Sequence, residues 1–183
     1  MREHLPWAGG HVGAVNRLGM PAASATVLGM SLDVELEVGR QDEESVARLL
    51  RALPEWFGLE AATQSYIDDA RTFPTVLAQV DGAVVGALLW KRHYPESAEV
   101  HLMAVEPSHH RVGIGTRLLE RAEEELRADG VRYLQVKTLG PSRPDDEYER
   151  TRLFYEARGF VPLEERFDVW PEDNPMLILV KAL

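Results

Sequence analysis

The chain has 183 residues, with 20 Lys+Arg against 30 Asp+Glu and no cysteine. This length suits one domain with a sizeable core. The net charge of −10 argues against a nucleic-acid partner, because non-specific phosphate binding needs clustered Lys and Arg. Without cysteine there are no disulfides, zinc-thiolate sites or cysteine nucleophiles, which is compatible with a cytoplasmic protein. No apolar run reaches the roughly 20 residues of a membrane-spanning helix, so we expect no membrane partner.

Residues 1–31 differ in kind from the rest of the chain. They hold only three charged side chains, Arg2, Glu3 and Arg17, and show neither strand alternation nor a helical stripe. Repeated glycine and polar residues interrupt the continuous apolar stretch that a secretory signal needs. We expect a disordered or loosely attached extension here, and a single domain over residues 32–183.

The domain is expected to begin with one strand and two helices. Residues 33–38 (DVELEV) alternate apolar and acidic side chains, which is typical of a half-buried strand. Asp42 can cap a helix whose apolar residues recur at helical spacing and which ends before Pro54. A second short helix is expected over residues 60–72.

A hairpin and a strand–helix–strand unit follow. Residues 75–80 and 83–90 are two strands joined by the Asp81-Gly82 dipeptide, a typical two-residue turn. Strands 98–105 and 132–138 flank a helix and should therefore lie parallel, with a right-handed crossover. A further helix is expected over about 148–158, and two last strands over 160–163 and 176–181. The prediction is a mixed α/β fold with a mostly antiparallel central sheet flanked by helices.

The segment from Val105 to Thr116 (VEPSHHRVGIGT) is a glycine-rich loop between a strand and a helix. Unpaired amides and the positive end of the helix dipole can bind an anion there without a lysine. No P-loop sequence is present, and the dinucleotide fingerprint fails because Leu118 stands where its third glycine is required. By itself the loop leaves an ordinary tight turn as the alternative.

Two motifs carry a resemblance to a known family. Residues His110–Gly115 follow the pattern [Q/R]-x-x-G-x-[G/A], with His110 departing at the first position, and Tyr155–Phe160 follow Tyr-x-x-x-Gly-Phe. In this order and separation they are far more specific than either motif alone. Over residues 33–183 the chain resembles the GNAT superfamily of acetyl-CoA-dependent N-acetyltransferases, which implies the GNAT-like fold.

The resemblance implies acetyl-CoA as the cosubstrate. Its pyrophosphate would lie on the loop amides and its pantetheine arm between strands 98–105 and 132–138. The coenzyme-binding residues implied in this way are Met103, Ala104, Val105, His110, Arg111, Val112, Gly113, Ile114, Gly115, Thr116 and Arg152. Arg152 is included for its charge, and a solvated helix residue is its alternative.

Three residues are candidates for the chemistry. Tyr155 matches the family's tyrosine, which donates a proton to the leaving thiolate, although a half-buried aromatic is the alternative. Glu99 matches a glutamate that accepts the amine proton, and His101 is a second candidate base because its ordinary pKa lies near neutrality. We expect Glu99, His101 and Met103 to share one face of their strand. An ordinary charged strand face is the alternative. Since no cysteine can carry the acetyl group, the amine must attack directly.

The acceptor site is less defined. Trp56 and Phe57 lie in a region that commonly borders the acceptor in this family, and together with Glu99 they are the expected substrate-binding residues. The alternative is that the two aromatic side chains only pack the two helices together. His93, His109 and His110 lack ligand spacing with carboxylates, so we expect no metal site. The favoured acceptor is a small-molecule amine. A protein or peptide acceptor, a non-catalytic acyl-CoA-binding module and an interaction domain with a structural turn remain alternatives, and a homodimer is compatible with the sequence.

Overall fold

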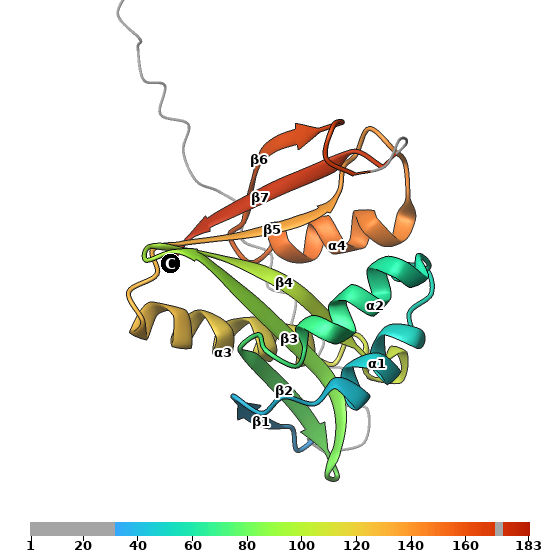
Figure 1. The fold of residues 1–183 in the computed structure, drawn as a ribbon, viewed down its shortest axis with the longest axis vertical. Helices are drawn as coiled ribbons and strands as arrows, with labels where there is room; N and C mark the ends of the chain where they lie inside the picture. Colours follow the sequence, from blue (N-terminus) through green and yellow to red (C-terminus); the bar gives the residue numbers. More distant parts are fainter. Residues whose placement is uncertain (1–31, 171–173) are drawn as a thin grey trace, which may run out of the picture. The chain divides into compact units, whose positions relative to one another are not determined.

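A seven-stranded sheet runs through the residues that the computed structural model describes, 32–170 and 174–183 (Figure 1). The strand order is β1-β2-β3-β4-β5-β7-β6, and every neighbouring pair is antiparallel except β4 and β5. The predicted extension, residues 1–31, lies outside the described residues.

The strands are β1 (Glu35–Val38), β2 (Thr75–Val80), β3 (Ala83–Tyr94), β4 (Ser97–Val105), β5 (Tyr133–Leu139), β6 (Val161–Arg166) and β7 (Met176–Ala182). The helices are α1 (Glu43–Arg51), α2 (Glu60–Asp69), α3 (Ile114–Ala128) and α4 (Asp146–Glu156), with a 3-10 turn, η1 (Pro107–His109), between β4 and α3.

The predicted fold class is confirmed. The Asp42 carboxylate accepts a hydrogen bond from the Ser45 amide and caps α1 as expected, and Gly130 has a positive φ just after α3. Strand β3 is longer than expected, because it continues past Trp90 to Tyr94, and α2 ends at Asp69 rather than at residue 72.

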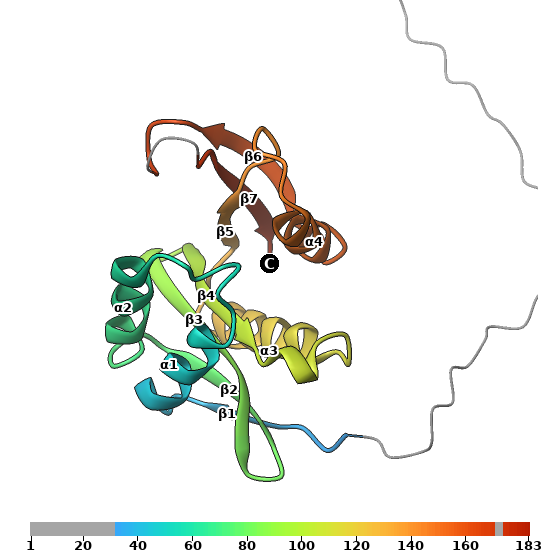
Figure 2. The ribbon, with the colours of Figure 1, turned by 90° about the vertical axis from the view of Figure 1, so that its right-hand side faces the viewer.

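Helices cover both faces of the sheet. Leu49 and Leu50 of α1 and Ile67 of α2 pack on one face, whereas α3 packs on the other (Figure 2). Helix α4 lies on the α3 side, where Tyr155 belongs to the same buried cluster. The sheet therefore has an α2 face and an α3 face, and both are buried.

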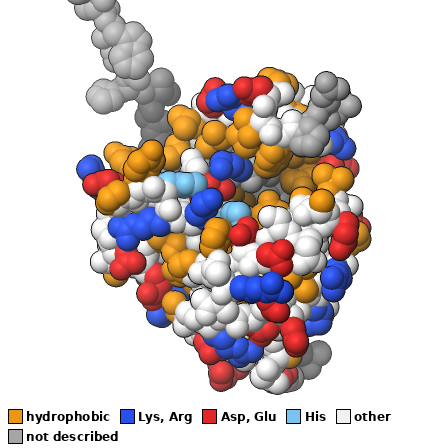
Figure 3. All heavy atoms as spheres, in the orientation of Figure 1, with side chains coloured by type: hydrophobic (Ala, Val, Ile, Leu, Met, Phe, Trp, Pro, Cys, Tyr) orange, Lys and Arg blue, Asp and Glu red, His pale blue; other side chains and the backbone are white. Residues whose placement is uncertain are grey.

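The surface carries charges of both signs. Acidic and basic side chains are interspersed over the face shown in Figure 3. In the described ranges, no helix is long and apolar enough to cross a lipid bilayer.

Strand β4 contains a bulge at its centre. Leu89 of β3 pairs with Leu102 and Trp90 pairs with Val100, so His101 is an extra residue on β4. Before the bulge the even-numbered residues of β4 belong to the core on the α3 face, and after it they belong to the core on the α2 face. The expectation that Met103 shares a face with Glu99 and His101 is therefore wrong, because the extra residue reverses the alternation.

The parallel pair β4–β5 separates halfway along. Pairing runs from Ser97 with Tyr133 to Val100 with Val136 and then stops, although both strands continue. Figure 1 shows that β4 and β5 lie farther apart toward their C-terminal ends. Beyond Val100, the backbone groups of β4 that face β5 have no strand partner.

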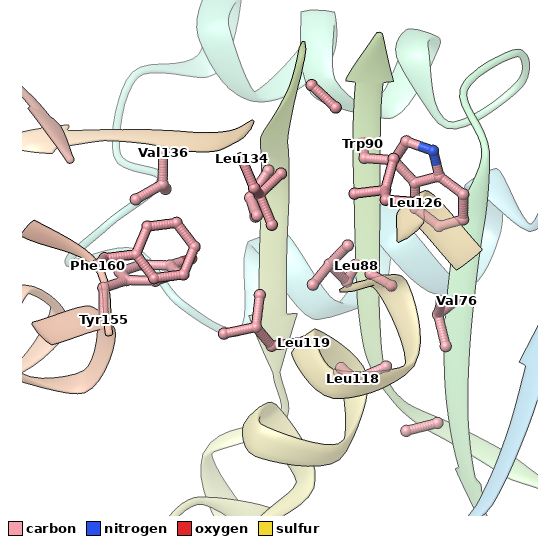
Figure 4. Packing of buried hydrophobic residues seen from close by; sticks show 14 of the residues in the cluster. Val76, Leu88, Trp90, Leu118, Leu119, Leu126, Leu134, Val136, Tyr155 and Phe160 are labelled. Atoms are coloured by element: carbon pink, nitrogen blue, oxygen red, sulfur yellow. The ribbon is translucent and has the colours of Figure 1, made fainter. Parts of the chain in front are cut away.

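Substitution of the buried Leu118 side chain in α3 tests this packing. It is fully buried among Val76, Leu88 and the other residues of Figure 4. We expect Leu118→Ala to lower the free energy of unfolding by about 2–5 kcal/mol, because it removes buried methyl groups and leaves a cavity. Urea unfolding measures this. Leu153→Ala, on the exposed face of α4, should cost under about 0.5 kcal/mol, and equal losses would contradict the assignment.

Candidate active site

A cavity of ≈ 750 Å³ opens where β4 ends and α3 begins. Its walls come from the α1–α2 connection, the end of β4, the glycine-rich loop and α4. They include Leu53, Trp56, Phe57, Met103, Ala104, Val105, His109, His110, Arg111, Gly113, Ile114, Gly115, Thr116, Thr151, Phe154, Tyr155 and Arg158. Figure 3 shows the surface hollowed among hydrophobic side chains. The cavity brings together all predicted site residues except Glu99, His101, Val112 and Arg152.

The glycine-rich loop presents unpaired amides. Gly113 caps α3 with a φ of 91°, and Arg111 has a φ of 67°, so the chain turns sharply before the helix. The amides of residues 111–116 have no hydrogen-bond acceptor in the described part of the chain. At the positive end of α3 they form a receptor for an anion.

Gly115 has a packing role in addition to the backbone accessibility that the sequence suggests. A Cβ atom at this position would lie 3.4 Å from the Phe154 ring. The missing side chain therefore lets the first turn of α3 pack against α4, as well as leaving the backbone accessible.

His110 holds the loop against β4. Its Nε2 lies 2.7 Å from the Val105 carbonyl oxygen, and its ring meets Trp56 edge-on with 6.4 Å between centroids. The residue that departs from the family motif thus anchors the loop by its own hydrogen bond.

Arg158 places a cation beside the first turn of α3, next to the loop. Its guanidinium stacks on Phe154, 3.7 Å from the ring centroid, and its Nε donates to Thr116 Oγ1 at 3.2 Å. Arg152 donates instead to the Leu139 carbonyl at 2.9 Å and does not line the cavity. Sequence reasoning selected Arg152 and missed Arg158, although Arg158 lies inside the Tyr155–Phe160 motif.

Tyr155 lies in the cavity wall with its ring almost fully enclosed. It is 4% exposed, and the Phe154 ring packs edge-on with 5.2 Å between centroids. The Phe160 ring packs edge-on with 5.3 Å between centroids (Figure 4). Burial raises the pKa of its phenol well above the ordinary value. No other described residue hydrogen-bonds its hydroxyl, so Tyr155 is a neutral donor without a protein acceptor.

Glu99 is buried on the α2 face, and one of its carboxylate oxygens has three hydrogen-bond partners. Its Oε2 accepts hydrogen bonds from Lys137 at 2.8 Å and Gln135 at 3.2 Å, and lies 2.7 Å from His93 Nε2. Burial pushes its pKa up, but the hydrogen bonds from Lys137 and His93 outweigh burial and lower the pKa overall. Glu99 is therefore ionised and a weaker base than an ordinary carboxylate.

His101 lies beside Glu99 on the same face. Its Nε2 is 2.8 Å from an Asp69 carboxylate oxygen at the end of α2, and its ring contacts Tyr66 and Phe73 edge-on. Nothing local in the sequence links Asp69 to β4, since 32 residues separate it from His101.

Two hydrogen bonds close the α1–α2 connection against α4. Trp56 Nε1 donates to Thr151 Oγ1 at 3.2 Å, and the Tyr148 hydroxyl donates to the Trp56 carbonyl at 3.1 Å. Trp56 and Phe57 therefore form a wall of the cavity.

Within residues 32–170 and 174–183, no group of three or more acidic, His or Cys side chains is arranged to hold a metal ion.

The depressed pKa of Glu99 predicts a pH-dependent contribution to stability. The ionised carboxylate stabilises the fold above its ordinary pKa of 4.5, and this contribution disappears as the pH falls through the lower folded value. We expect Glu99→Gln to cost about 1–3 kcal/mol at pH 7 and clearly less below pH 4, by urea unfolding.

Glu164→Gln is the control, because Glu164 is exposed and pairs with Arg166 at 3.8 Å. It should change stability by under about 0.5 kcal/mol. A cost for Glu99→Gln that does not depend on pH would contradict the assignment.

Known proteins show which family this arrangement belongs to. The family described as Acetyltransferase (GNAT) domain matches residues 71–162. Mycothiol acetyltransferase of Beutenbergia cavernae is 31% identical over 83 residues, which are 45% of this chain and 26% of that protein. The chain thus spans about a quarter of the length of this curated relative.

Solved structures share the fold. A GNAT-family structure from Desulfovibrio desulfuricans has a TM-score of 0.71 at 21% identity, covering 82% of this chain and 99% of its own. A GNAT acetyltransferase from Elizabethkingia anophelis with acetyl-CoA bound has a TM-score of 0.65 at 17% identity, covering 82% and 98%. Because the family match spans half of the chain and includes the loop and Tyr155, the chain belongs to the GNAT acetyltransferase family.

Proposed function

We propose that this protein transfers the acetyl group of acetyl-CoA directly to the primary amine of a small molecule. The observation that carries the proposal is the cavity itself, which has the free amides of residues 111–116 at one end and the unpaired hydroxyl of Tyr155 in its wall. Such a cavity combines an anion receptor with a neutral proton donor.

The residues present fit acetyl-CoA. The loop amides and the Arg158 guanidinium would hold its phosphates. Beyond Val100, the edge of β4 that no longer pairs with β5 offers backbone donors and acceptors to an amide-bearing arm and to a developing oxyanion. When bound, acetyl-CoA supplies an activated thioester.

The amine must lose a proton before it attacks. Glu99 is poorly suited as the base, because a single oxygen already holds hydrogen bonds from three neighbours and its pKa is lowered. His101 is the better candidate, since imidazole ordinarily titrates near neutral pH. Glu99 then acts by neutralising Lys137 and fixing the strands around His101.

Tyr155 serves the leaving group. Because its pKa is raised, the phenol stays protonated throughout the physiological range and can donate a hydrogen bond to the departing thiolate. A thiol with a pKa of about 8.5 forms a comparatively stable thiolate, so a neutral hydrogen-bond donor is sufficient to assist its departure.

The enclosure of the cavity favours a small acceptor over a protein or peptide. The hydrogen bonds of Trp56 to Thr151 and of Tyr148 to Trp56 join the α1–α2 connection to α4. The whole cavity, which the coenzyme would share with the acceptor, has ≈ 750 Å³, the size of a small-molecule site.

Acetyl-CoA binding is the first test. At 100-fold excess over Kd, acetyl-CoA should stabilise the protein by about 2.7 kcal/mol, measured as a rise in Tm. Gly113→Val should abolish this rise, because the residue needs a positive φ at the amide receptor.

Gly39→Val is the matched control for that test. Gly39 has a φ of 85° and, like Gly113, no atom within 4 Å of a Cβ position. It shares the backbone strain but lies far along the chain from the loop, so the acetyl-CoA shift should persist. No stabilisation of the wild-type protein would reject the proposal.

Turnover tests the role of Tyr155. Tyr155→Phe should lower kcat at least about 100-fold with acetyl-CoA affinity within about twofold, because only the proton donor is lost. The measurement is free coenzyme A released with a panel of polyamines, aminoglycosides, amino acids and peptide N-termini. Tyr94→Phe, at an exposed tyrosine of β3, is the control. An unchanged kcat would remove Tyr155 from the mechanism. Affinity without any turnover would favour the non-catalytic acyl-CoA-binding module.

A further inference from the structure

A histidine and an aspartate form an isolated pair on the α2 face of the sheet. Asp69 ends α2, His101 is the bulged residue of β4, and 2.8 Å separates Asp69 Oδ2 from His101 Nε2. Among the described side chains, His101 is the only hydrogen-bond or ion-pair partner of the Asp69 carboxylate. The negative charge is therefore directed at the imidazole, in contrast with Glu99, whose charge Lys137 neutralises.

Aromatic side chains fix the plane of the imidazole. The Phe73 ring lies 4.8 Å and the Tyr66 ring 5.2 Å from the His101 ring, both inclined to it. Tyr66 in turn meets Phe57, a wall residue of the cavity, at 5.9 Å. The ring can thus turn little about its side-chain bonds, and only 17% of the His101 side chain is exposed.

The pairing determines which nitrogen is free. A carboxylate at Nε2 favours the tautomer with the proton on that atom, because only an N–H can donate to it. Nδ1 then keeps its lone pair, and no described residue hydrogen-bonds it. The same carboxylate stabilises the imidazolium that forms when Nδ1 takes up a proton.

The charged and titratable groups around His101 are few. Asp69 and Tyr66 face it from α2, Glu99 precedes it on β4, and Lys91 of β3 lies 5.8 Å from the centroid of the neighbouring Phe73 ring. Of these, only Asp69 touches an imidazole nitrogen.

We propose that Asp69 is a positioning residue that holds His101 as the base of the acetyl transfer, with Nε2–H donated to Asp69 and Nδ1 open to the acceptor. As the amine nitrogen bonds to the acetyl carbon and the carbon–sulfur bond breaks, the amine proton passes through water to Nδ1, because His101 does not line the cavity. The sulfur leaves with the bonding electron pair, and the imidazolium later releases its proton to solvent. This inference rests on the proposed function.

The kinetic test uses Asp69→Asn. We expect kcat to fall about 10- to 100-fold with the KM for acetyl-CoA unchanged, because the imidazole loses the carboxylate that orients it. In an His101→Ala background, Asp69→Asn should have no further effect, since the two residues act as a unit.

Asp68→Asn is the matched control. Asp68 is the preceding residue of α2, bound to Gln64 and Arg71 and not to β4. It should leave kcat unchanged. An unchanged kcat in Asp69→Asn, or an equal loss when His101 is already absent, would overturn the proposal.

A second readout does not depend on turnover. In the wild-type protein with ¹⁵N-labelled histidine, NMR should show the neutral His101 ring as the Nε2–H tautomer. An Nδ1–H tautomer in the wild type would reject the proposal. Failure of the proposed function is a separate result, namely no stabilisation of the wild type by acetyl-CoA.

Discussion

The end of the β4–β5 ladder at Val100 and Val136 is the constraint on which the site depends. Two parallel strands that stay paired satisfy each other's backbone N–H and C=O groups. Strands that diverge leave some of these groups without a strand partner inside the fold. The bulge at His101 falls at this same point, so the strand loses one neighbour and shifts register with the other. The cavity, the His101 pair and the free backbone of β4 all follow from this one local departure from regular pairing.

The regular parts of the fold were predictable because their signals are local. The Asp81-Gly82 turn, the Asp42 cap and the glycine after α3 each act over a few residues and determine where elements start and stop. The bulge was not predictable, since an extra residue on one strand is visible only against its partner. That is why Met103 was expected on the wrong face.

The candidate site divides in the same way. The loop and Tyr155 lie in contiguous motifs, and the structure brings them to one cavity. The surroundings of Glu99 come from β3 and β5, and the partner of His101 comes from α2, 32 residues earlier. Contacts at such separations leave no pattern in a single sequence. A carboxylate that matched the family therefore proved to be tied to a lysine, and a second arginine, Arg158, stands closer to the loop than Arg152.

Because the alternation of side chains between the two faces of the sheet reverses at the bulge, β4 presents odd-numbered residues to both faces. Met103 faces the core beside α3, and His101, two residues earlier, faces α2. In the proposed reaction, the coenzyme-binding Met103 and the base His101 therefore project from β4 toward different faces of the sheet. Substitutions in α2 and the connection before it can alter which amine is accepted while the anion loop stays intact. A protein built in this way can diversify its acceptors without having to rebuild its coenzyme site.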